Sequence, residues 1–153
     1  MLTPSEAAPT FRLKDQDGEV VALKDLAGSP VVIYFYPKDD TPGCTTQACA
    51  IRDQWREFEE AGAVVLGVSP DDVDSHAKFA AKYDLPHRLL ADPDREAIDA
   101  YGAWGPKKVR GREFEGVIRS TVLVDAEGNV AAVWPKVDPK SHADEVLEAI
   151  RAL

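Results

Sequence analysis

Continuous apolar runs alternate along the chain with segments in which apolar residues recur every three or four positions. Residues 31–36 form an apolar run of β-branched and aromatic side chains that ends at Pro37, and this run predicts a strand buried on both faces. Residues 63–68 predict a second buried strand, and Leu89 and Leu90 a short third one. Strands of this kind are typical of the centre of a parallel sheet.

Segments with helical periodicity separate these strands. Five residues fall at steps of four, three, four and three, the spacing of one helix face, before Gly62 can end the helix: Cys44, Ala48, Ile51, Trp55 and Phe58. Residues 72–83 and 95–101 predict two more helices. A last helix follows Ser141, which stands three residues before Asp144 in a spacing that resembles a capping box.

Two turn signals complete the pattern. Asp17-Gly18 separates residues 11–13 from residues 20–23, and Glu127-Gly128 separates residues 121–124 from residues 130–134, so each pair predicts a β-hairpin. Alternating strands and helices between the hairpins imply right-handed crossovers and parallel neighbours. The order predicts an α/β protein with a thioredoxin-like fold. It would be one domain over residues 1–153, with an N-terminal β-hairpin and a mixed central sheet covered by helices on both faces.

The composition narrows the class of function. Of the 153 residues, 44% are hydrophobic and 29% are charged, and the formal net charge is −9. This acidity argues against a protein that binds nucleic acid or docks on an anionic membrane, because both partners require positive charge on the protein. Local positive potential is expected where basic residues cluster in one stretch: Lys107, Lys108, Arg110, Arg112 and Arg119.

The first residues and the cysteine content bear on the compartment. Residues 1–6 contain neither a basic nor an apolar segment, so no secretory signal is visible, and residues 4–9 are expected to be a loose lead-in. No apolar run is long enough to span a bilayer. We therefore expect a cytoplasmic protein, in which Cys44 and Cys49 are not expected to form a structural disulfide. Redox chemistry or simple burial is then left for these two thiols.

The most informative stretch joins the first buried strand to the helix that begins near Cys44. The predicted order places Cys44 at the carboxyl end of a central strand, where open α/β sheets bind ligands. A thiol at a helix start meets unpaired backbone N–H groups and the positive end of the helix dipole, which favour thiolate over thiol. Thr41 adds a hydroxyl nearby, and Gly43 permits close backbone approach. Because Cys44 also lies on the apolar helix face, a small buried side chain is the alternative interpretation.

Cys49 is the second thiol, five residues after Cys44. On an ideal helix, Cα atoms five residues apart are separated by roughly 8.5 Å, whereas a disulfide requires about 7 Å or less. Cys44 and Cys49 can therefore pair only if the first helical turns unwind, and Thr45 and Thr46 make that unwinding easier than an Ala/Leu run would. An inert thiol on the helix flank is the alternative.

Other candidate groups carry weaker signals. Arg119 begins an apolar strand, where it either pairs with a carboxylate or stands as a fixed cation beside the thiolate. His76, His87 and His142 are scattered, and each is interpreted as a surface or capping residue. The two cysteines lack the spacing of a tetrahedral metal site, and no metal or other cofactor is expected. A cysteine–histidine hydrolase is a disfavoured alternative, since it would need a histidine and an orienting group beside the thiol.

The stretch Pro37-x3-Thr41-x2-Cys44 resembles the active-site signature of peroxiredoxins. Residues 34–49, with a second cysteine five residues after the first, are similar to the Q-type, or bacterioferritin-comigratory, subfamily. Further matching segments extend the resemblance over nearly the whole chain: Gly67-Val68-Ser69, Ser75-His76, Tyr101-Gly102-x-Trp104-Gly105, residues 116–121 and Val124-Asp125-x-x-Gly128.

This resemblance implies a thiol peroxidase that reduces hydrogen peroxide and organic hydroperoxides in antioxidant defence. Cys44 would be the peroxidatic cysteine that becomes a sulfenic acid. Thr41 and Arg119 would hold the peroxide and the thiolate, and Pro37 would shield the pocket from water. Cys49 would be the resolving cysteine, which forms an intramolecular disulfide that thioredoxin reduces. By the same resemblance, the single pair of cysteines suggests a monomer.

A thioredoxin-fold dithiol oxidoreductase, or a redox-regulated binding module acting on protein disulfides, is the alternative from a different class. Dithiol oxidoreductases typically use Cys-x-x-Cys, whereas four residues separate the two thiols of this chain. The spacing therefore favours the peroxidase.

Overall fold

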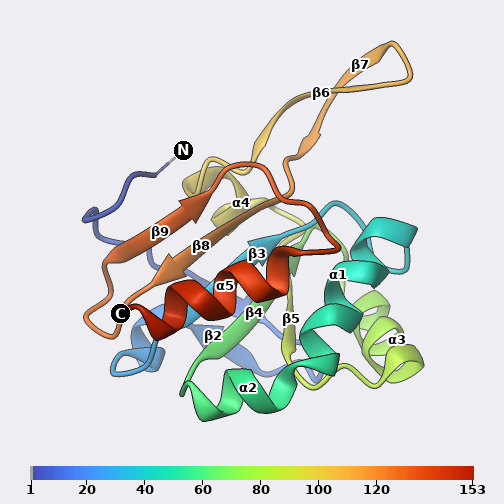
Figure 1. Cartoon of the computed structure of the whole chain (residues 1–153). Helices are drawn as coiled ribbons and strands as arrows, with labels where there is room; N and C mark the ends of the chain where they lie inside the picture. The colour runs from blue at the N-terminus through green and yellow to red at the C-terminus, as the bar shows by residue number, and fades with distance from the viewer. Residues whose placement is uncertain (1) are drawn as a thin grey trace.

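The computed structural model describes residues 2–153, and most of its strands form one seven-stranded sheet (Figure 1). Its strands are β1 (Arg12–Lys14), β2 (Val20–Ala22), β3 (Val31–Phe35), β4 (Val64–Ser69), β5 (Arg88–Ala91), β8 (Ser120–Val124) and β9 (Val130–Trp134). They lie in the order β2-β1-β5-β4-β3-β8-β9. β4 pairs in parallel with β3 and β5, and the other pairs are antiparallel. The predicted mixed sheet and N-terminal hairpin are both present.

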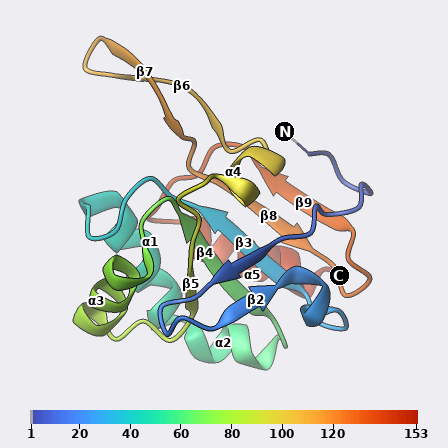
Figure 2. The ribbon, with the colours of Figure 1, turned by 180° about the vertical axis from the view of Figure 1, so that it is seen from behind.

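Helices cover both faces of this sheet, as predicted (Figures 1 and 2). One face packs against α1 (Pro42–Asp53), α2 (Trp55–Glu60), α3 (Val73–Tyr83) and α5 (His142–Arg151). The other face packs against α4 (Glu96–Ala100) and the 3₁₀ helix η1 (Leu23–Leu26). Among residues 2–153, no helix is both long and apolar enough to cross a bilayer.

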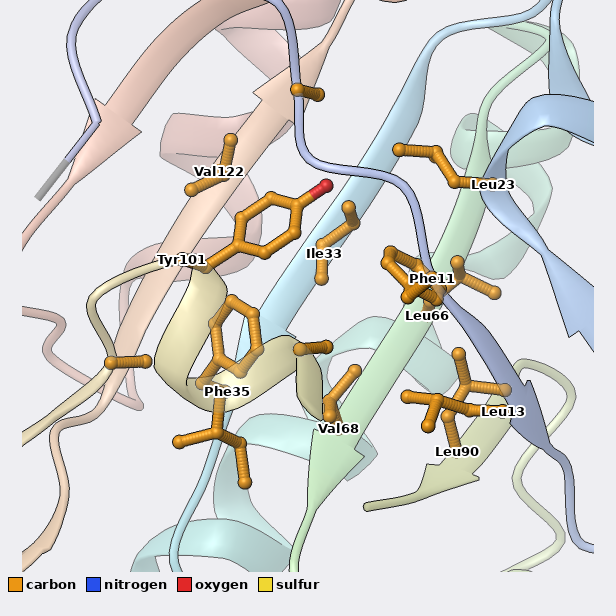
Figure 3. Packing of buried hydrophobic residues seen from close by; sticks show 14 of the residues in the cluster. Phe11, Leu13, Leu23, Ile33, Phe35, Leu66, Val68, Leu90, Tyr101 and Val122 are labelled. Atoms are coloured by element: carbon orange, nitrogen blue, oxygen red, sulfur yellow. The ribbon is translucent and has the colours of Figure 1, made fainter. Parts of the chain in front are cut away.

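The alternation of side chains along β3 creates two cores, one on each face of the sheet. Ile33 and Phe35 point to the α4 side, where they pack with Leu66 and Tyr101 (Figure 3). Tyr34 points to the opposite side, beneath α1, and is also fully enclosed. The continuous apolar run in the sequence reflects this burial on both faces.

The helix predicted from the spacing of Cys44 to Phe58 is in fact two helices. The backbone leaves the helical conformation at Gln54 (φ −111°, ψ 20°), which ends α1 and precedes α2. Phe58 still packs in the same core as Cys44. The apolar spacing therefore predicted the buried face correctly but could not register the interruption of the backbone.

A second, two-stranded sheet is absent from the sequence prediction. It consists of β6 (Trp104–Val109) and β7 (Arg112–Val117), and it projects from the body of the molecule as a hairpin (Figures 1 and 2). Four of the five clustered basic residues lie on this hairpin and its tip: Lys107, Lys108, Arg110 and Arg112. Because both strands are largely exposed, the segment lacks the apolar alternation that identifies strands.

Two details near the chain ends also differ from expectation. The lead-in is tied to β9, since the Val130 backbone accepts from Ser5 N–H at 2.8 Å and donates to the Glu6 carbonyl at 2.8 Å. Ser141 precedes α5, but its side chain makes no capping hydrogen bond. Its hydroxyl lies 3.4 Å from Glu145 instead, so the predicted capping box is wrong.

The interpretation of the three histidines as surface or capping residues is wrong. His76, His87 and His142 are at most 4% exposed. Each ring finds a polar partner on a distant element: His87 Nε2 lies 2.7 Å from the Tyr34 hydroxyl, and His142 Nε2 lies 2.7 Å from the Thr121 hydroxyl. Sequence alone does not reveal these partners, because they come together only through the sheet.

Burial makes stability sensitive to acid through His87. Desolvation lowers the pKa of this imidazole to about 3, below the value of about 6.5 expected in the unfolded chain. The unfolded state therefore binds a proton at a pH where the folded state does not. The free energy of unfolding consequently falls as the pH drops below the pKa of the unfolded chain. From about pH 7 to about pH 4 we expect a loss of about 3 kcal/mol in unfolding free energy from this residue.

Denaturant unfolding of the wild type and of His87→Gln measures this contribution. The glutamine retains a polar partner for Tyr34 but does not titrate, so its stability should decline less over the same pH range. Parallel stability curves for the two proteins would show that His87 is not responsible.

Candidate active site

A loop at the carboxyl end of β3 leads directly into α1. This active-site loop (residues 36–41) ends at Thr41, which is the N-cap of α1, and Pro42 occupies the first helical position. Cys44 is therefore the third residue of the helix. The N–H groups of Gly43 and Cys44 lie in the first turn, where an α-helix supplies no backbone acceptor, and no acidic residue is present in that turn. This environment favours a negative charge on the sulfur.

Arg119 is the direct partner of this thiol. The pairing of β3 with β8 sets Phe35 opposite Ser120, so the residue before β8 lies beside the start of α1. Arg119 Nη2 is 3.2 Å from Cys44 Sγ. A Cβ atom at position 43 would lie only 3.1 Å from the same nitrogen, so glycine leaves room for the guanidinium.

Gln47 holds the other side of the guanidinium. Its Oε1 accepts a hydrogen bond of 2.8 Å from Arg119 Nη1. The ion pairs of the described residues do not include Arg119, so the alternative of a carboxylate partner is not observed. Sequence reasoning missed Gln47, although its position three residues after Cys44 on a helix was a usable signal.

Cys44 is buried, and its sulfur makes a polar contact. The residue is only 1% exposed, and its sulfur faces Arg119 rather than apolar side chains alone. Tyr34 lies beneath it, and burial, followed by the negative charge of Cys44, raises the pKa of that phenol well above its ordinary value. At this depth the sulfur presents almost no surface to solvent or to another protein in this state.

Thr41 and Pro37 lie on the active-site loop that precedes α1. The Thr41 hydroxyl donates a hydrogen bond of 2.8 Å to the Lys38 carbonyl, so its proton is committed and its oxygen is left as an acceptor. Pro37 follows the end of β3 and is half-buried. The structure therefore brings Thr41, Cys44 and Arg119 together at the start of α1, and Pro37 lies on the same loop, directly after Tyr36.

Cys49 lies further along the same unbroken helix. Both thiols are free, Cys44 is buried and Cys49 is half-buried. Since α1 is continuous from Pro42 to Asp53, the two sulfurs are separated by more than one helical turn in this state. Their pairing requires α1 to unwind, as expected from the spacing of the two cysteines.

Comparisons with known proteins identify the family of the chain. A model described as the AhpC/TSA family matches residues 4–133. The chain belongs to this family. Peroxiredoxin Bcp of Bacillus subtilis is 45% identical over 146 residues, which cover 95% of this chain and 93% of that protein. The Q-type peroxiredoxin predicted from the sequence is therefore confirmed, and the chain is an enzyme, a peroxidase.

Solved structures extend the agreement to the fold. The bacterioferritin comigratory protein of Xanthomonas campestris, described for its alkyl peroxide reduction activity, is 41% identical with a TM-score of 0.88, covering 93% of this chain and 90% of that one. A cysteine-to-serine mutant of PrxQ from Xylella fastidiosa is 30% identical with a TM-score of 0.93, covering 99% and 97%. The thioredoxin-like fold predicted from the order of elements is confirmed.

Lys107 is a second cation close to the peroxiredoxin site. Its Nζ folds back from the hairpin to donate a hydrogen bond of 2.7 Å to the Val117 carbonyl. Desolvation lowers the pKa of Lys107, the positive charge of Arg119 lowers it further, and the negative charge of Cys44 opposes both effects. The base of the hairpin thus adds to the positive potential around the sulfur.

One group of potential metal ligands exists within residues 2–153. Atoms of Asp39, Asp71 and His76 lie within 4.8 Å of one another. Each of these atoms is already engaged in hydrogen bonds at 2.7–2.8 Å, so the group is a hydrogen-bonded cluster that braces the active-site loop.

Replacing Arg119 by alanine should lower the fraction of Cys44 that is ionised at neutral pH. A charge-assisted hydrogen bond contributes about 1.5–3 kcal/mol, so the equilibrium constant for ionisation of the thiol should fall about tenfold or more. The ultraviolet absorbance of the thiolate, followed over pH in a Cys49→Ser background, measures this fraction. Arg112→Ala removes the same charge from exposed β7 and is the matched control. Equal titrations for the two variants would remove Arg119 from the site.

Proposed function

We propose that this peroxiredoxin reduces hydrogen peroxide and organic hydroperoxides through Cys44, with Cys49 as the resolving thiol. The observation that carries the proposal is the contact between Cys44 Sγ and Arg119 Nη2 at the first turn of α1. A sulfur held by a cation and a helix N-terminus is stabilised as the thiolate, which is the nucleophilic form. Its burial restricts access to small molecules such as hydroperoxides.

The first step is attack of the thiolate on the terminal oxygen of the hydroperoxide. A sulfur–oxygen bond forms, the oxygen–oxygen bond breaks, and the leaving oxygen takes a proton to depart as water or an alcohol. Arg119 and the N–H groups of Gly43 and Cys44 donate to the oxygens as negative charge moves onto them. The Thr41 oxygen, whose own proton is committed to Lys38, accepts from the substrate. Cys44 becomes a sulfenic acid.

Pro37 shields the reacting sulfur from water. Its ring has no N–H to donate and fixes the backbone where β3 passes into the active-site loop. Half-buried on the active-site loop, Pro37 limits the entry of water to the reacting sulfur. Exclusion of water strengthens the interactions of Arg119 with the charged atoms.

The second step joins the two sulfurs of one helix. After the first turns of α1 unwind, the Cys49 thiolate attacks the Cys44 sulfur, a disulfide forms, and the sulfenic oxygen leaves as water. Gln47 favours this unwinding, because its Nε2 is buried without a hydrogen-bond partner among the described residues and gains water when the helix opens. Both thiols belong to one chain, which supports catalysis by a monomer.

A dithiol reductant closes the cycle by exchange with the Cys44–Cys49 disulfide. The resemblance to Q-type peroxiredoxins supports thioredoxin in this role, in a cytoplasmic setting where reduced thioredoxin is available. The alkyl peroxide reduction named for the Xanthomonas campestris relative supports organic hydroperoxides as substrates beside hydrogen peroxide.

Cys44→Ser should abolish the consumption of peroxide, because a serine hydroxyl is not ionised at neutral pH and cannot accept the electrophilic oxygen. Stopped-flow mixing with hydrogen peroxide measures the loss, with thermal unfolding as the control for folding. Peroxide consumption at the wild-type rate would discard Cys44 as the reacting residue.

Cys49→Ser should allow one oxidation and then stop. The expected product after one equivalent of peroxide is a chain that has gained a single oxygen atom at Cys44, whereas the wild type loses two hydrogen atoms. Intact-mass measurement with peptide mapping distinguishes these products. Sustained turnover of the variant with thioredoxin as reductant would show that Cys49 is not the resolving thiol, even if Cys44 is the nucleophile.

A further inference from the structure

A buried hydrogen-bond cluster anchors the active-site loop at Asp39, between Pro37 and Thr41. Asp39 is 8% exposed. Its Oδ1 accepts a hydrogen bond of 2.6 Å from the Tyr36 hydroxyl, and its Oδ2 accepts one of 2.8 Å from Ser75. The same Oδ2 lies 2.7 Å from Nδ1 of His76, which is fully buried. None of these groups contacts Cys44 through a hydrogen bond, and the peroxidase mechanism above does not use them.

The positions of the hydrogen-bond partners fix the protons of His76. Its Nε2 lies 2.9 Å from the Leu90 carbonyl oxygen, which can only accept, so Nε2 carries a proton. The Tyr36 hydroxyl also lies 3.4 Å from Nδ1, but its proton is donated to Asp39 Oδ1 at 2.6 Å. A neutral ring would then present the bare lone pair of Nδ1 to the Asp39 carboxylate at 2.7 Å, and two acceptors repel at this distance. A second proton must lie between them. The hydroxyl groups of Tyr36 and Ser75 both donate to the Asp39 carboxyl group and stabilise its ionised form, so this proton belongs to His76.

We propose that His76 is an imidazolium ion, and that its pair with the Asp39 carboxylate positions the active-site loop for the reaction with peroxide. Asp39 and His76 are positioning residues, because they act through Pro37 and Thr41 rather than on the substrate. This inference rests on the peroxidase function proposed above. It assigns a proton to His76 Nδ1 that the chemistry of Cys44 does not itself require.

The other groups around the pair are consistent with a held positive charge. From the end of β4, the Asp71 carboxylate accepts from the Asp39 N–H at 2.8 Å and from the Ser69 hydroxyl at 2.7 Å. Tyr36 directly follows β3. Burial raises the pKa of its phenol well above the ordinary value, so the hydroxyl keeps its proton and remains a donor. From the start of α3, Asp72 accepts from the Ser75 N–H. One imidazolium is therefore surrounded by carboxylates and neutral donors, with no competing cation in these contacts.

Neighbouring charges on the loop belong to a separate contact. Asp40 is left-handed in its backbone (φ 57°) and directs its carboxylate outward to Lys82 at 2.7 Å and to the Tyr83 hydroxyl at 2.7 Å. The active-site loop thus contacts α3 at two places: Asp40 bonds to it at the surface, and Asp39 bonds to it in the interior. Only the interior contact involves a histidine ring.

Loss of the Nδ1 proton of His76 would break its hydrogen bond to Asp39 Oδ2. Two acceptors would then face each other within the core, and the loop would move away from α3 to relieve the repulsion. Pro37 and Thr41 would move with it, since they flank Asp39. The rate with peroxide should consequently fall at alkaline pH, although the thiolate fraction of Cys44 only increases there.

The test compares the pH profile of kcat/KM for hydrogen peroxide in the wild type, Asp39→Asn and Asp94→Asn. The wild type should lose about tenfold or more on the alkaline side of its maximum, as expected when a buried hydrogen bond is replaced by repulsion. In Asp39→Asn the new amide N–H can donate to a neutral His76, so the alkaline loss should be absent from this variant. Asp94 is exposed and lies outside the cluster, so Asp94→Asn controls for the change in net charge. Identical alkaline profiles in all three proteins would overturn the proposal.

Two further measurements separate positioning from simple stabilisation. Asp39→Ala removes the anchor and should lower kcat/KM about tenfold at every pH, and the asparagine variant should restore it relative to alanine. Nitrogen-15 NMR of the His76 ring at neutral pH should show both ring nitrogens protonated in the wild type and only one in Asp39→Asn. A bare Nδ1 in the wild type would overturn the proposal. Binding of Zn²⁺ with displacement of that proton would also overturn it, because a metal ion would then be the natural occupant.

The NMR measurement involves no peroxide. It therefore tests the state of His76 even if the assignment of Cys44 or Cys49 should fail in the experiments above.

Discussion

The contact between Cys44 Sγ and Arg119 Nη2, at 3.2 Å, joins two residues that are 75 positions apart. It depends on the register of β3 against β8, because that register places the residue before Ser120 beside the loop that follows Phe35. A shift of one residue in this pairing would turn the side chains of β8 to the opposite face and separate the cation from the thiol. The chemistry of the site is therefore fixed by hydrogen bonds of the sheet as much as by the residues that touch the sulfur.

The core around α1 is not purely apolar, because it contains polar side chains whose hydrogen bonds position the site. Tyr34 bonds to His87, Tyr36 bonds to Asp39, and Gln47 bonds to Arg119. Apolar side chains of similar volume would pack in many nearly equivalent ways, whereas hydrogen bonds at 2.6–2.8 Å define one arrangement of loop and helix. Burial of these groups also makes the fold sensitive to acid, since His87 resists protonation in the folded state.

Local patterns in the sequence predicted most of the sheet and the place of Cys44 at the start of α1, because burial on both faces of β3 and the turn into α1 leave local signals. The partners of buried polar residues could not be predicted in the same way. His76 reads as an ordinary helical residue until β5 brings the Leu90 carbonyl to one ring nitrogen and the loop brings Asp39 to the other. The hairpin of β6 and β7 escaped detection because its strands face solvent, so their polar residues lack a period.

The break at Gln54 reconciles two opposing demands on α1. The helix must be intact to direct its first N–H groups at the sulfur, yet in the proposed cycle it must unwind for the two cysteines to meet. Because the helical backbone already ends at Gln54, α2 is a separate helix with its own buried residue, Phe58, and the proposed unwinding of the first turns of α1 does not require α2 to open. The opening thus involves one helix, in which the buried Nε2 of Gln47 has no hydrogen-bond partner among the described residues. A continuous helix from Cys44 to Phe58 would have added the packing of Phe58 to that of Ala48 and Ile51, which α1 itself contributes to the core.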